Sequence, residues 1–522
     1  MLQVTPSPPA LPRKANLIII LMIFLWVLLL YGNTALSHPV NVFLYLIASL
    51  ITFYVLRRLL LNYNILFPVI ITMLFMAHPV HTEVVASLKN RDEILAFLLG
   101  MAGMYTLMSY INTLRFLNIL QTSIFYALAC VASFSALPFI GLYLLVLYFF
   151  GKLRLRVFLS AAILIILAAF MVSFFSQLFF SYTPNATAYV ENALYVEKSL
   201  WIRLGTSMMS LLFYLRILFY PYPLLYYYGY NMIPLTSLGS PLALLSFVFH
   251  ALLIVYAMIN IRSKSFLSFA ILWYLITIFI YSNLLFPVNG VVAERFVFTA
   301  SLGFIMAVVF IIFKLFNAEP NSLTIEIDSR IKIIALVIII LIPSGLLTIN
   351  RNADWRSEKS LYAHDIPHLD KSAKANYLYA QYLIASIRND ENFISYGTSD
   401  PLVRETIKEH LRLALKIYPE SVNALNDLGD VFMSFENRYD SALYFFRKAV
   451  VVDRLFIPGW NNIGLANKQL GHYPQARACY QKVLDIQPGN TKACFAIAQL
   501  YNELGNTDKA RYYFDLGKRA AR

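Results

Sequence analysis

Long apolar runs dominate the first two thirds of this 522-residue chain and limit what it can fold into. About 20 apolar residues in a helix are enough to cross a bilayer, and fewer suffice where neighbouring helices shield the ends. Backbone that faces lipid must satisfy its hydrogen bonds within the segment, which favours helices. The sequence therefore predicts an all-α polytopic bundle of about eleven spans, at about 16–32, 39–56, 64–77, 93–110, 118–136, 137–151, 157–180, 242–260, 266–286, 297–316 and 331–349.

The apolar character stops abruptly near residue 350. Residues 1–350 contain 19 Lys+Arg and 9 Asp+Glu, whereas residues 351–522 contain 23 and 19. We therefore predict a multi-span membrane domain at 1–350, a connecting helix at 351–372 and a soluble domain at 373–522. Of the formal net charge of +14, the membrane part carries +10. This placement favours interaction with membrane lipids and predicts no nucleic-acid binding.

The basic residues also predict an orientation. With the N-terminus in the cytoplasm, thirteen of the 19 cations in residues 1–350 fall on the inner side and six on the outer side, as the positive-inside rule requires. This count depends on residues 202–240, where prolines in "YPYP" predict a broken segment that enters and leaves on the same side. An odd number of spans then places the C-terminal domain in the periplasm of a bacterial inner membrane protein, or in the lumen in a eukaryote.

Ionisable residues interrupt the apolar chain most densely in "MLFMAHPVHTEVVASLKNRDEIL" (73–95). In the predicted orientation, most acidic residues of the membrane domain lie outside, namely Glu83, Asp92, Glu93, Glu191, Glu197 and Glu294. Charge near a bilayer is costly and usually marks function. Structural interpretations stay open, because Glu83 and Asp92 would also suit the starts of helices, and Glu294 with Arg295 would suit an ion pair.

The last third of the chain repeats itself every 34 residues. The stretch 460–490 aligns without gaps with 494–520, and earlier copies lie at about 422–456 and from residue 373. The residues that match the tetratricopeptide pattern in 460–490 include Trp460, Gly464, Ala476, Tyr480 and Pro488. About four such repeats predict an α-solenoid whose concave groove binds a protein or peptide, although a spacer or a dimer face stays open.

Three cysteines, Cys130, Cys479 and Cys494, are too few for a disulfide framework. Cys130 lies in an apolar run and is expected to be a small buried side chain. Whether Cys479 pairs with Cys494 stays open.

Four collinear segments resemble the TMTC family, whose members join a membrane bundle to a C-terminal tetratricopeptide array. They are "AHPVHTEVVASLKNRDEILA" (77–96), "FYLRILFYPYPLLYYYGYNMIP" (213–234), "GVVAERFVFTASLGF" (290–304) and "NADWRSEKSLY" (352–362). With the repeats, the resemblance extends from about residue 39 to the end. It implies a bundle like those of the GT-C glycosyltransferases. It also implies transfer of a mannose-type sugar from a polyprenyl-phosphate donor to a protein on the outer side.

The resemblance implies roles for ionisable residues of these segments. Such a transfer needs cations against the donor phosphate, a carboxylate that takes the acceptor proton, and often a divalent metal. The catalytic candidates are Asp92, Glu294 and Glu83. The candidates for phosphate binding are Arg91, Arg295 and Lys89, and His78 and His81 are candidates for a metal.

The first outer loop departs from the family pattern. In the family this loop is long and carries the aspartates to which the catalytic base is assigned. Here "LLLYGNTALSHPVNVFLYL" (28–46) turns within about six residues and has no carboxylate, which leaves only His38 as a local base. Either the base has moved, to Asp92 or Glu294, or the protein is an inactive membrane-anchored scaffold for protein partners. A transporter is less favoured, because no inverted repeat is visible.

Overall fold

The computed structural model describes residues 13–151, 159–160, 162–164, 166–167, 170, 192–389 and 400–521. Every regular element among these residues is a helix, as predicted. Contacts divide the chain into two units, Met1–Gly229 with Ile233–Asp365 and Tyr230–Met232 with Ile366–Arg522. The predicted span at 157–180 lies mostly outside the described residues, as do Lys152, Arg154, Arg156 and Glu191.

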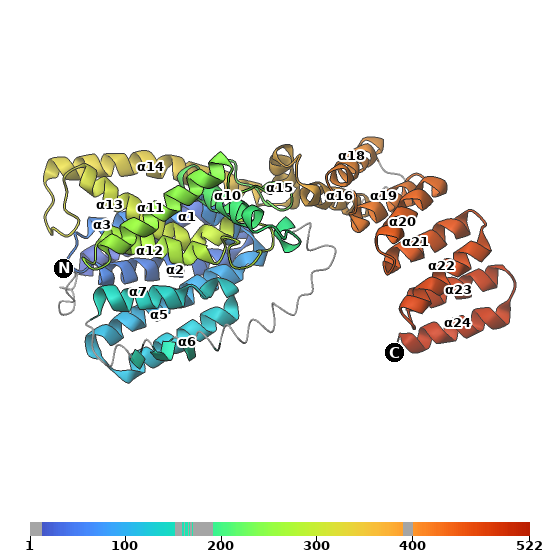
Figure 1. The fold of residues 1–522 in the computed structure, drawn as a ribbon, viewed down its shortest axis with the longest axis horizontal. Helices are drawn as coiled ribbons and strands as arrows, with labels where there is room; N and C mark the ends of the chain where they lie inside the picture. Colours follow the sequence, from blue (N-terminus) through green and yellow to red (C-terminus); the bar gives the residue numbers. More distant parts are fainter. Residues whose placement is uncertain are drawn as a thin grey trace. The chain divides into compact units, whose positions relative to one another are not determined.

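The first unit is the apolar helical bundle (Figure 1). Its elements are α1 (Arg13–Ser37), α2 (Pro39–Leu59), α3 (Leu66–Ala77), η1 (Pro79–His81), α4 (Thr82–Ala86), η2 (Leu88–Asn90), α5 (Arg91–Thr113), α6 (Phe116–Ala132), η3 (Phe134–Ala136), α7 (Phe139–Phe150), η4 (Ala193–Tyr195), α10 (Leu200–Phe219), α11 (Pro241–Asn260), α12 (Phe266–Phe279), η5 (Glu294–Val297), α13 (Phe298–Leu315), α14 (Ile327–Asp354) and α15 (Glu358–Asp365).

Ten of the eleven predicted spans coincide with helices in the described part of the chain. Among the described residues, seven helices qualify as membrane spans by length and composition, or up to eight if α3 and the η1–α4 segment, bent by 57°, form one. Helices α6 and α12 are apolar but shorter, as is the stretch Phe134–Phe150 that contains α7. The protein is therefore a multi-pass helical bundle, and eleven spans remains a prediction.

Contacts between distant segments define two ends of this bundle. At one end, called the site end, Asn352 of α14 donates to Leu30 O at 2.9 Å, and Thr348 donates to Ala77 O at 2.8 Å. At the opposite end Asn64 N–H donates to Pro320 O at 3.0 Å, and Tyr148 donates to Ile261 O at 3.4 Å. The matched segments 77–96, 290–304 and 352–362 all reach the site end.

The break that the sequence predicts in 202–240 is present, and it follows the end of helix α10. The prolines of "YPYP" do not interrupt it, because it ends at Phe219 before the first of them. The chain then folds back, so that Leu238 N–H donates to Trp201 O at 3.0 Å near the start of α10. At the other end of α10, Leu218 O lies 3.0 Å from His78 Nε2. The C-terminal end of α10 therefore lies at the site end. Its length and composition would also admit α10 as a span, so entry and exit on one side remains a prediction.

Local sequence explains where several elements start and how closely they pack. Helix α11 begins with Pro241 after Ser240, whose hydroxyl accepts from Ala243 N at 3.4 Å. Helices α12 and α13 approach closely at Gly303, where a Cβ would lie 2.6 Å from Tyr274 N. Small residues at such crossings let helices pack in lipid.

The second unit is a series of helix pairs that follows the predicted 34-residue period. Its elements are η6 (Ile366–His368), α16 (Ala373–Arg388), α18 (Pro401–Ile417), α19 (Val422–Ser434), α20 (Tyr439–Val452), α21 (Ile457–Gln469), α22 (Tyr473–Ile486), α23 (Thr491–Glu503) and α24 (Thr507–Ala520). Its aromatic core packs against the glycines of the first helix in a pair, as Phe446 does on Gly429 and Tyr480 on Gly464. The three cysteines are free thiols, and Cys130 is buried as expected.

Candidate functional site

The turn between α1 and α2 is shorter than the six or so residues that the sequence predicts. Only His38 separates Ser37, the last residue of α1, from Pro39, the first of α2. No acceptor loop can form here. Helix α2 instead supports the neighbouring segment, because Asn41 donates to Val85 O at 3.1 Å and to Ser87 O at 2.9 Å, and accepts from Arg91 Nε at 2.8 Å.

His78 and His81 are buried, and each uses both ring nitrogens within the protein. Nδ1 of His78 accepts from Val80 N at 3.4 Å, so Nε2 carries the proton donated to Leu218 O. His81 Nδ1 lies 2.7 Å from Tyr45 Oη, and its Nε2 lies 3.0 Å from Ser301 Oγ. Among the described residues, no group of three or more His, Cys, Asp or Glu side chains is arranged to hold a metal. A metal bound by these two histidines would have to break the bonds that orient them.

Glu83 pairs with Arg295, which lies 212 positions away in the sequence. Arg295 Nη1 donates to Glu83 Oε1 at 2.5 Å, and Arg295 N–H donates to Oε2 at 2.9 Å. The Glu83 side chain is 5% exposed and that of Arg295 30% exposed. Glu83 therefore joins α4 to η5 through a partly buried ion pair, so neither the cap interpretation nor a Glu294–Arg295 pair describes these residues.

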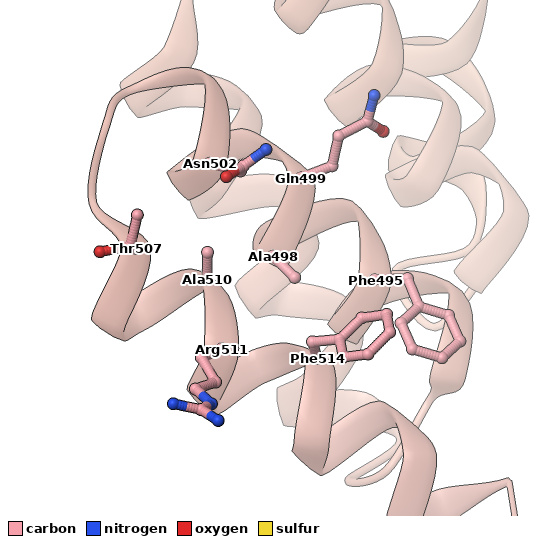
Figure 2. Close-up of a pocket in the computed structure, with 8 residues that line it drawn as sticks. All are labelled: Phe495, Ala498, Gln499, Asn502, Thr507, Ala510, Arg511 and Phe514. Carbon is pink, nitrogen blue, oxygen red and sulfur yellow. The ribbon is translucent and has the colours of Figure 1, made fainter.

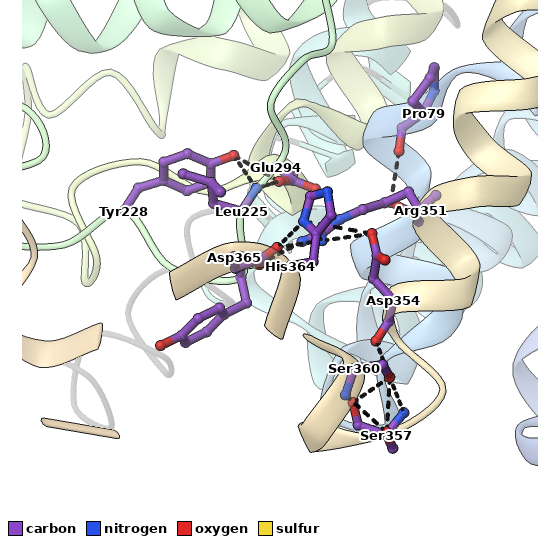
Figure 3. Close-up of polar contacts among 12 residues, drawn as sticks. Pro79, Leu225, Tyr228, Glu294, Arg351, Asp354, Ser357, Ser360, His364 and Asp365 are labelled. Atoms are coloured by element: carbon purple, nitrogen blue, oxygen red, sulfur yellow. Dashed lines mark hydrogen bonds and ion pairs between the residues drawn. The ribbon is translucent and has the colours of Figure 1, made fainter. Parts of the chain in front are cut away.

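Glu294 is fully buried and is held by the loop that follows α10. Its Oε1 accepts from Leu225 N at 2.7 Å and from the Tyr228 hydroxyl at 2.8 Å (Figure 3). Burial raises the pKa of Tyr228 well above its ordinary value, and the adjacent Glu294 raises it further, so Tyr228 stays protonated as a donor. Glu294 Oε2 is buried without a hydrogen-bond partner.

A second buried ion pair connects α14 to α15. Arg351 donates to Asp365 Oδ1 at 2.7 Å and Oδ2 at 2.9 Å, and these residues are 5% and 0% exposed (Figure 3). Asp365 Oδ2 also accepts from Tyr226 N at 2.7 Å, and His364 Nδ1 lies 2.7 Å from Oδ1. Arg351 Nε, like Glu294 Oε2, is a buried atom without a partner.

The sequence reasoning missed Arg351, Asp365 and Tyr228 as site residues. A signal was present, since Arg351 follows the last apolar run and directly precedes the matched segment "NADWRSEKSLY". That segment contributes Asp354, which accepts from Arg351 Nη1 at 3.3 Å, and it lies between Arg351 before it and Asp365 after it. Their contact depends on the turn between α14 and α15.

The remaining predicted residues lie at the exposed rim of the site end. Lys89, Arg91 and Asp92 are exposed in η2 and the first turn of α5. Glu93 is partly buried and accepts from Ser133 Oγ at 3.3 Å. The site end thus has one partly buried and one buried ion pair, together with a rim that offers two cations and one carboxylate to solvent. Such a rim can hold an anionic group and accept a proton.

The fold and this cluster define a class, namely multi-pass helical membrane proteins with ionisable groups at one bundle end and a tetratricopeptide-repeat unit. Tetratricopeptide repeat family models match residues 457–490 and 491–521.

Curated relatives show a more specific similarity. It is 27% identical over 284 residues to "Protein O-mannosyl-transferase TMTC1" of Mus musculus, which covers 53% of this chain and 28% of that protein. It is 24% identical over 348 residues to "Protein O-mannosyl-transferase F38B6.6" of Caenorhabditis elegans, covering 65% of this chain and 46% of that one. The chain is TMTC-like, and it spans less than half the length of either relative.

Solved structures are similar to part of this chain. The crystal structure of MamA is 20% identical, with a TM-score of 0.25, over 31% of this chain and 90% of that chain. PilF of Pseudomonas aeruginosa is 18% identical, with a TM-score of 0.24, over 34% and 68%. TM-scores of this size add nothing to the assignment.

Proposed function

We propose that the protein is a membrane glycosyltransferase that moves a mannose-type sugar from a polyprenyl-phosphate donor to a hydroxyl of a protein acceptor at the site end. The observation that carries this proposal is the meeting of segments 77–96 and 290–304 at one bundle end, joined by the Glu83–Arg295 pair. Burying a charge in an apolar bundle costs free energy, and such charges usually have a function. The names of the curated relatives support the same reaction.

In the proposed reaction, an acceptor oxygen attacks the anomeric carbon while the bond from that carbon to the phosphate oxygen breaks. Polyprenyl phosphate leaves, and the acceptor proton passes to a carboxylate. Asp92 suits this role best, because it is exposed, whereas Glu83 is paired with Arg295 and Glu294 is fully buried. Arg91 and Lys89 would neutralise the leaving phosphate. Glu294, through Tyr228 and Leu225, would position the loop after α10.

The test measures release of polyprenyl phosphate from a polyprenyl-phosphate mannose by the purified chain in nanodiscs. Wild type should turn over, and Asp92→Asn should lower kcat by about 100-fold or more, as expected for loss of a general base. Asp328→Asn is the matched control, because Asp328 is exposed at the opposite end and pairs with Lys332. Repeating the assay with a chelator and then with Mg²⁺ or Mn²⁺ tests the expected divalent metal.

The proposed orientation places the N-terminus in the cytoplasm and the site end, with the repeats, on the periplasmic or lumenal side. A membrane-impermeant thiol reagent should label Lys89→Cys in sealed right-side-out vesicles and should not label Lys314→Cys from the opposite end. Labelling of Lys314→Cys alone would reverse the orientation.

The one-residue turn between α1 and α2 favours a second function, an inactive scaffold that recruits a protein partner through the repeats. In that case no donor is consumed by wild type, even with acceptor peptides present. Turnover that depends on Asp92 would exclude this alternative.

A further inference from the structure

The turn that leads into η5 contains a backbone conformation that its sequence does not favour. Val291 N–H donates to Val288 O at 3.1 Å, and Gly290, the third residue of this turn, has φ +87°, which glycine adopts freely. Val291 follows with φ +62°. Of the seven non-glycine residues with positive φ in the described part of the chain, Val291 alone is β-branched. Such a residue is strained, and it keeps this conformation only where its surroundings impose it.

The side chain of Asn283 holds both ends of this turn. Asn283 is 2% exposed, its Oδ1 accepts from Val288 N–H at 2.8 Å, and its Nδ2 donates to Val291 O at 2.8 Å. The N–H of Val291 is thus tied to Val288 and its carbonyl to Asn283. Neither peptide group of Val291 can rotate unless one of these bonds breaks.

Two further polar side chains hold Asn283 in place. Asn192, which is fully buried before η4, donates from Nδ2 to Asn283 Oδ1 at 2.9 Å and to Val288 O at 2.8 Å. Ser210 of α10 accepts from Asn283 Nδ2 at 3.3 Å. A buried amide is costly when its partners are missing, so this network specifies one position of the turn.

The strained residue stands three positions before Glu294 and four before Arg295. Ala293 is extended, with φ −154°, so a rotation at Val291 displaces the start of η5. Glu294 is there the acceptor for the loop after α10 (Figure 3), and Arg295 N–H donates to Glu83 Oε2 at 2.9 Å. The conformation of one valine therefore sets where both ionisable groups of η5 lie.

We propose that Asn283 is a positioning residue, which holds Val291 in the left-handed conformation and thereby places Glu294 and Arg295 for the transfer. Its effect on turnover rests on the proposed function, whereas its effect on the geometry of η5 does not. An asparagine that only satisfied the backbone of the turn would act in the same way whatever residue stood at position 291.

Glycine at position 291 separates these two roles, because glycine adopts a positive φ without being held there. Asn283→Ala should speed hydrogen exchange of the Arg295 amide, which Glu83 protects, by about tenfold. Adding Val291→Gly to Asn283→Ala should restore part of this protection, whereas adding Val291→Ala should restore none. Val291→Ala is the matched control, because it also shortens the side chain but still disfavours the positive φ.

The full chain in nanodiscs is used throughout. Helices α23 and α24, which line a pocket in the second unit (Figure 2), are the internal reference, and their exchange should equal that of wild type in each variant. If Asn283→Ala does not fold, Asn192→Ala takes its place in the same comparison, because Asn192 is one of the side chains that hold Asn283.

Turnover is the second readout. Asn283→Ala should lower kcat by about tenfold and change KM by less than about twofold, because the rim cations Lys89 and Arg91 stay in place. Unchanged exchange of the Arg295 amide in Asn283→Ala, or equal effects of glycine and alanine at position 291, would overturn the inference. A wild-type chain without turnover would refute the proposed function, while the exchange comparison would still decide the role of Asn283.

Discussion

The pair formed by Arg351 and Asp365 allows the sharpest prediction about stability. Both side chains are almost inaccessible to water, at 5% and 0% exposure, and they share two hydrogen bonds of 2.7 and 2.9 Å. Removing one partner of a buried pair leaves an uncompensated charge and costs about 3–5 kcal/mol. We therefore expect Arg351→Met to lower the free energy of unfolding by about 3–5 kcal/mol.

The double variant Arg351→Met with Asp365→Leu should recover part of this loss, because neither charge remains. It should still cost about 1–3 kcal/mol, since the Tyr226 N–H that donates to Asp365 at 2.7 Å loses its acceptor. The two substitutions should thus be strongly non-additive, as expected of residues in contact.

Unfolding of the purified chain by SDS in mixed micelles, followed by tryptophan fluorescence, measures these free energies. Trp355 is a local reporter, because its ring centroid lies 5.6 Å from the guanidinium carbon of Arg351. Lys314→Met is the control. Lys314 pairs with Glu319 at the opposite end, where both side chains are exposed, so its loss should cost less than about 1 kcal/mol. The pair does not hold α15 to α14 if Arg351→Met loses no more free energy of unfolding than the control. The same conclusion follows if the loss in the double variant equals the sum of the losses in the two single variants.

Two further predictions concern packing and pH. Gly303→Val should lower the free energy of unfolding by at least about 1–3 kcal/mol, because the added carbons meet backbone atoms of α12 that cannot step aside. Gly32→Ala, where a Cβ meets nothing within 4 Å, is its control in the same titration and should be neutral or slightly stabilising. Burial lowers the pKa of His410, whose Nδ1 lies 2.7 Å from Asn376 Oδ1. As the pH falls below the ordinary pKa of histidine, the unfolded chain therefore binds a proton before the folded chain does. Stability of α16 and α18 should then decline from pH 7.5 to pH 5, by at most about 1.4 kcal/mol per pH unit, as measured by amide hydrogen exchange. His410→Gln should decline less, and an unchanged slope in that variant would assign the effect to other groups.

The course of the chain could be predicted because periodicity and hydropathy are local properties. Apolar runs predict the helices of the first unit, and the 34-residue period predicts the helix pairs of the second. Both patterns involve residues that are between a few positions and one repeat apart in the sequence. Alternation of spans also predicts that Glu83 and Glu294 lie at one end of the bundle. The structure confirms this, since Arg295, the neighbour of Glu294, pairs with Glu83.

The partners of the charged residues could not be predicted in the same way. Glu83 suited a helix start as well as an ion pair, and only the approach of η5 to α4 decides between them. Asp365 is separated from Arg351 by a turn whose geometry no periodicity describes. Glu294 is bonded by the loop after α10, whose return path depends on Gly205 packing against the backbone of Thr236 to Leu238.

Three residues between α10 and α11 complicate any attempt to separate the two units. Tyr230 to Met232 group with the repeats, where the Asn231 amide donates to Lys371 O at 3.2 Å and the Tyr230 ring lies 5.9 Å from that of Tyr418. The polypeptide therefore crosses from one unit to the other three times. A single protease cut after Asp365 would break one of these three covalent connections. Residues 230–232 would still contact the repeats noncovalently. A repeat fragment that starts at Ile366 would lack residues 230–232. It would therefore expose the surface around Tyr418 that these residues contact.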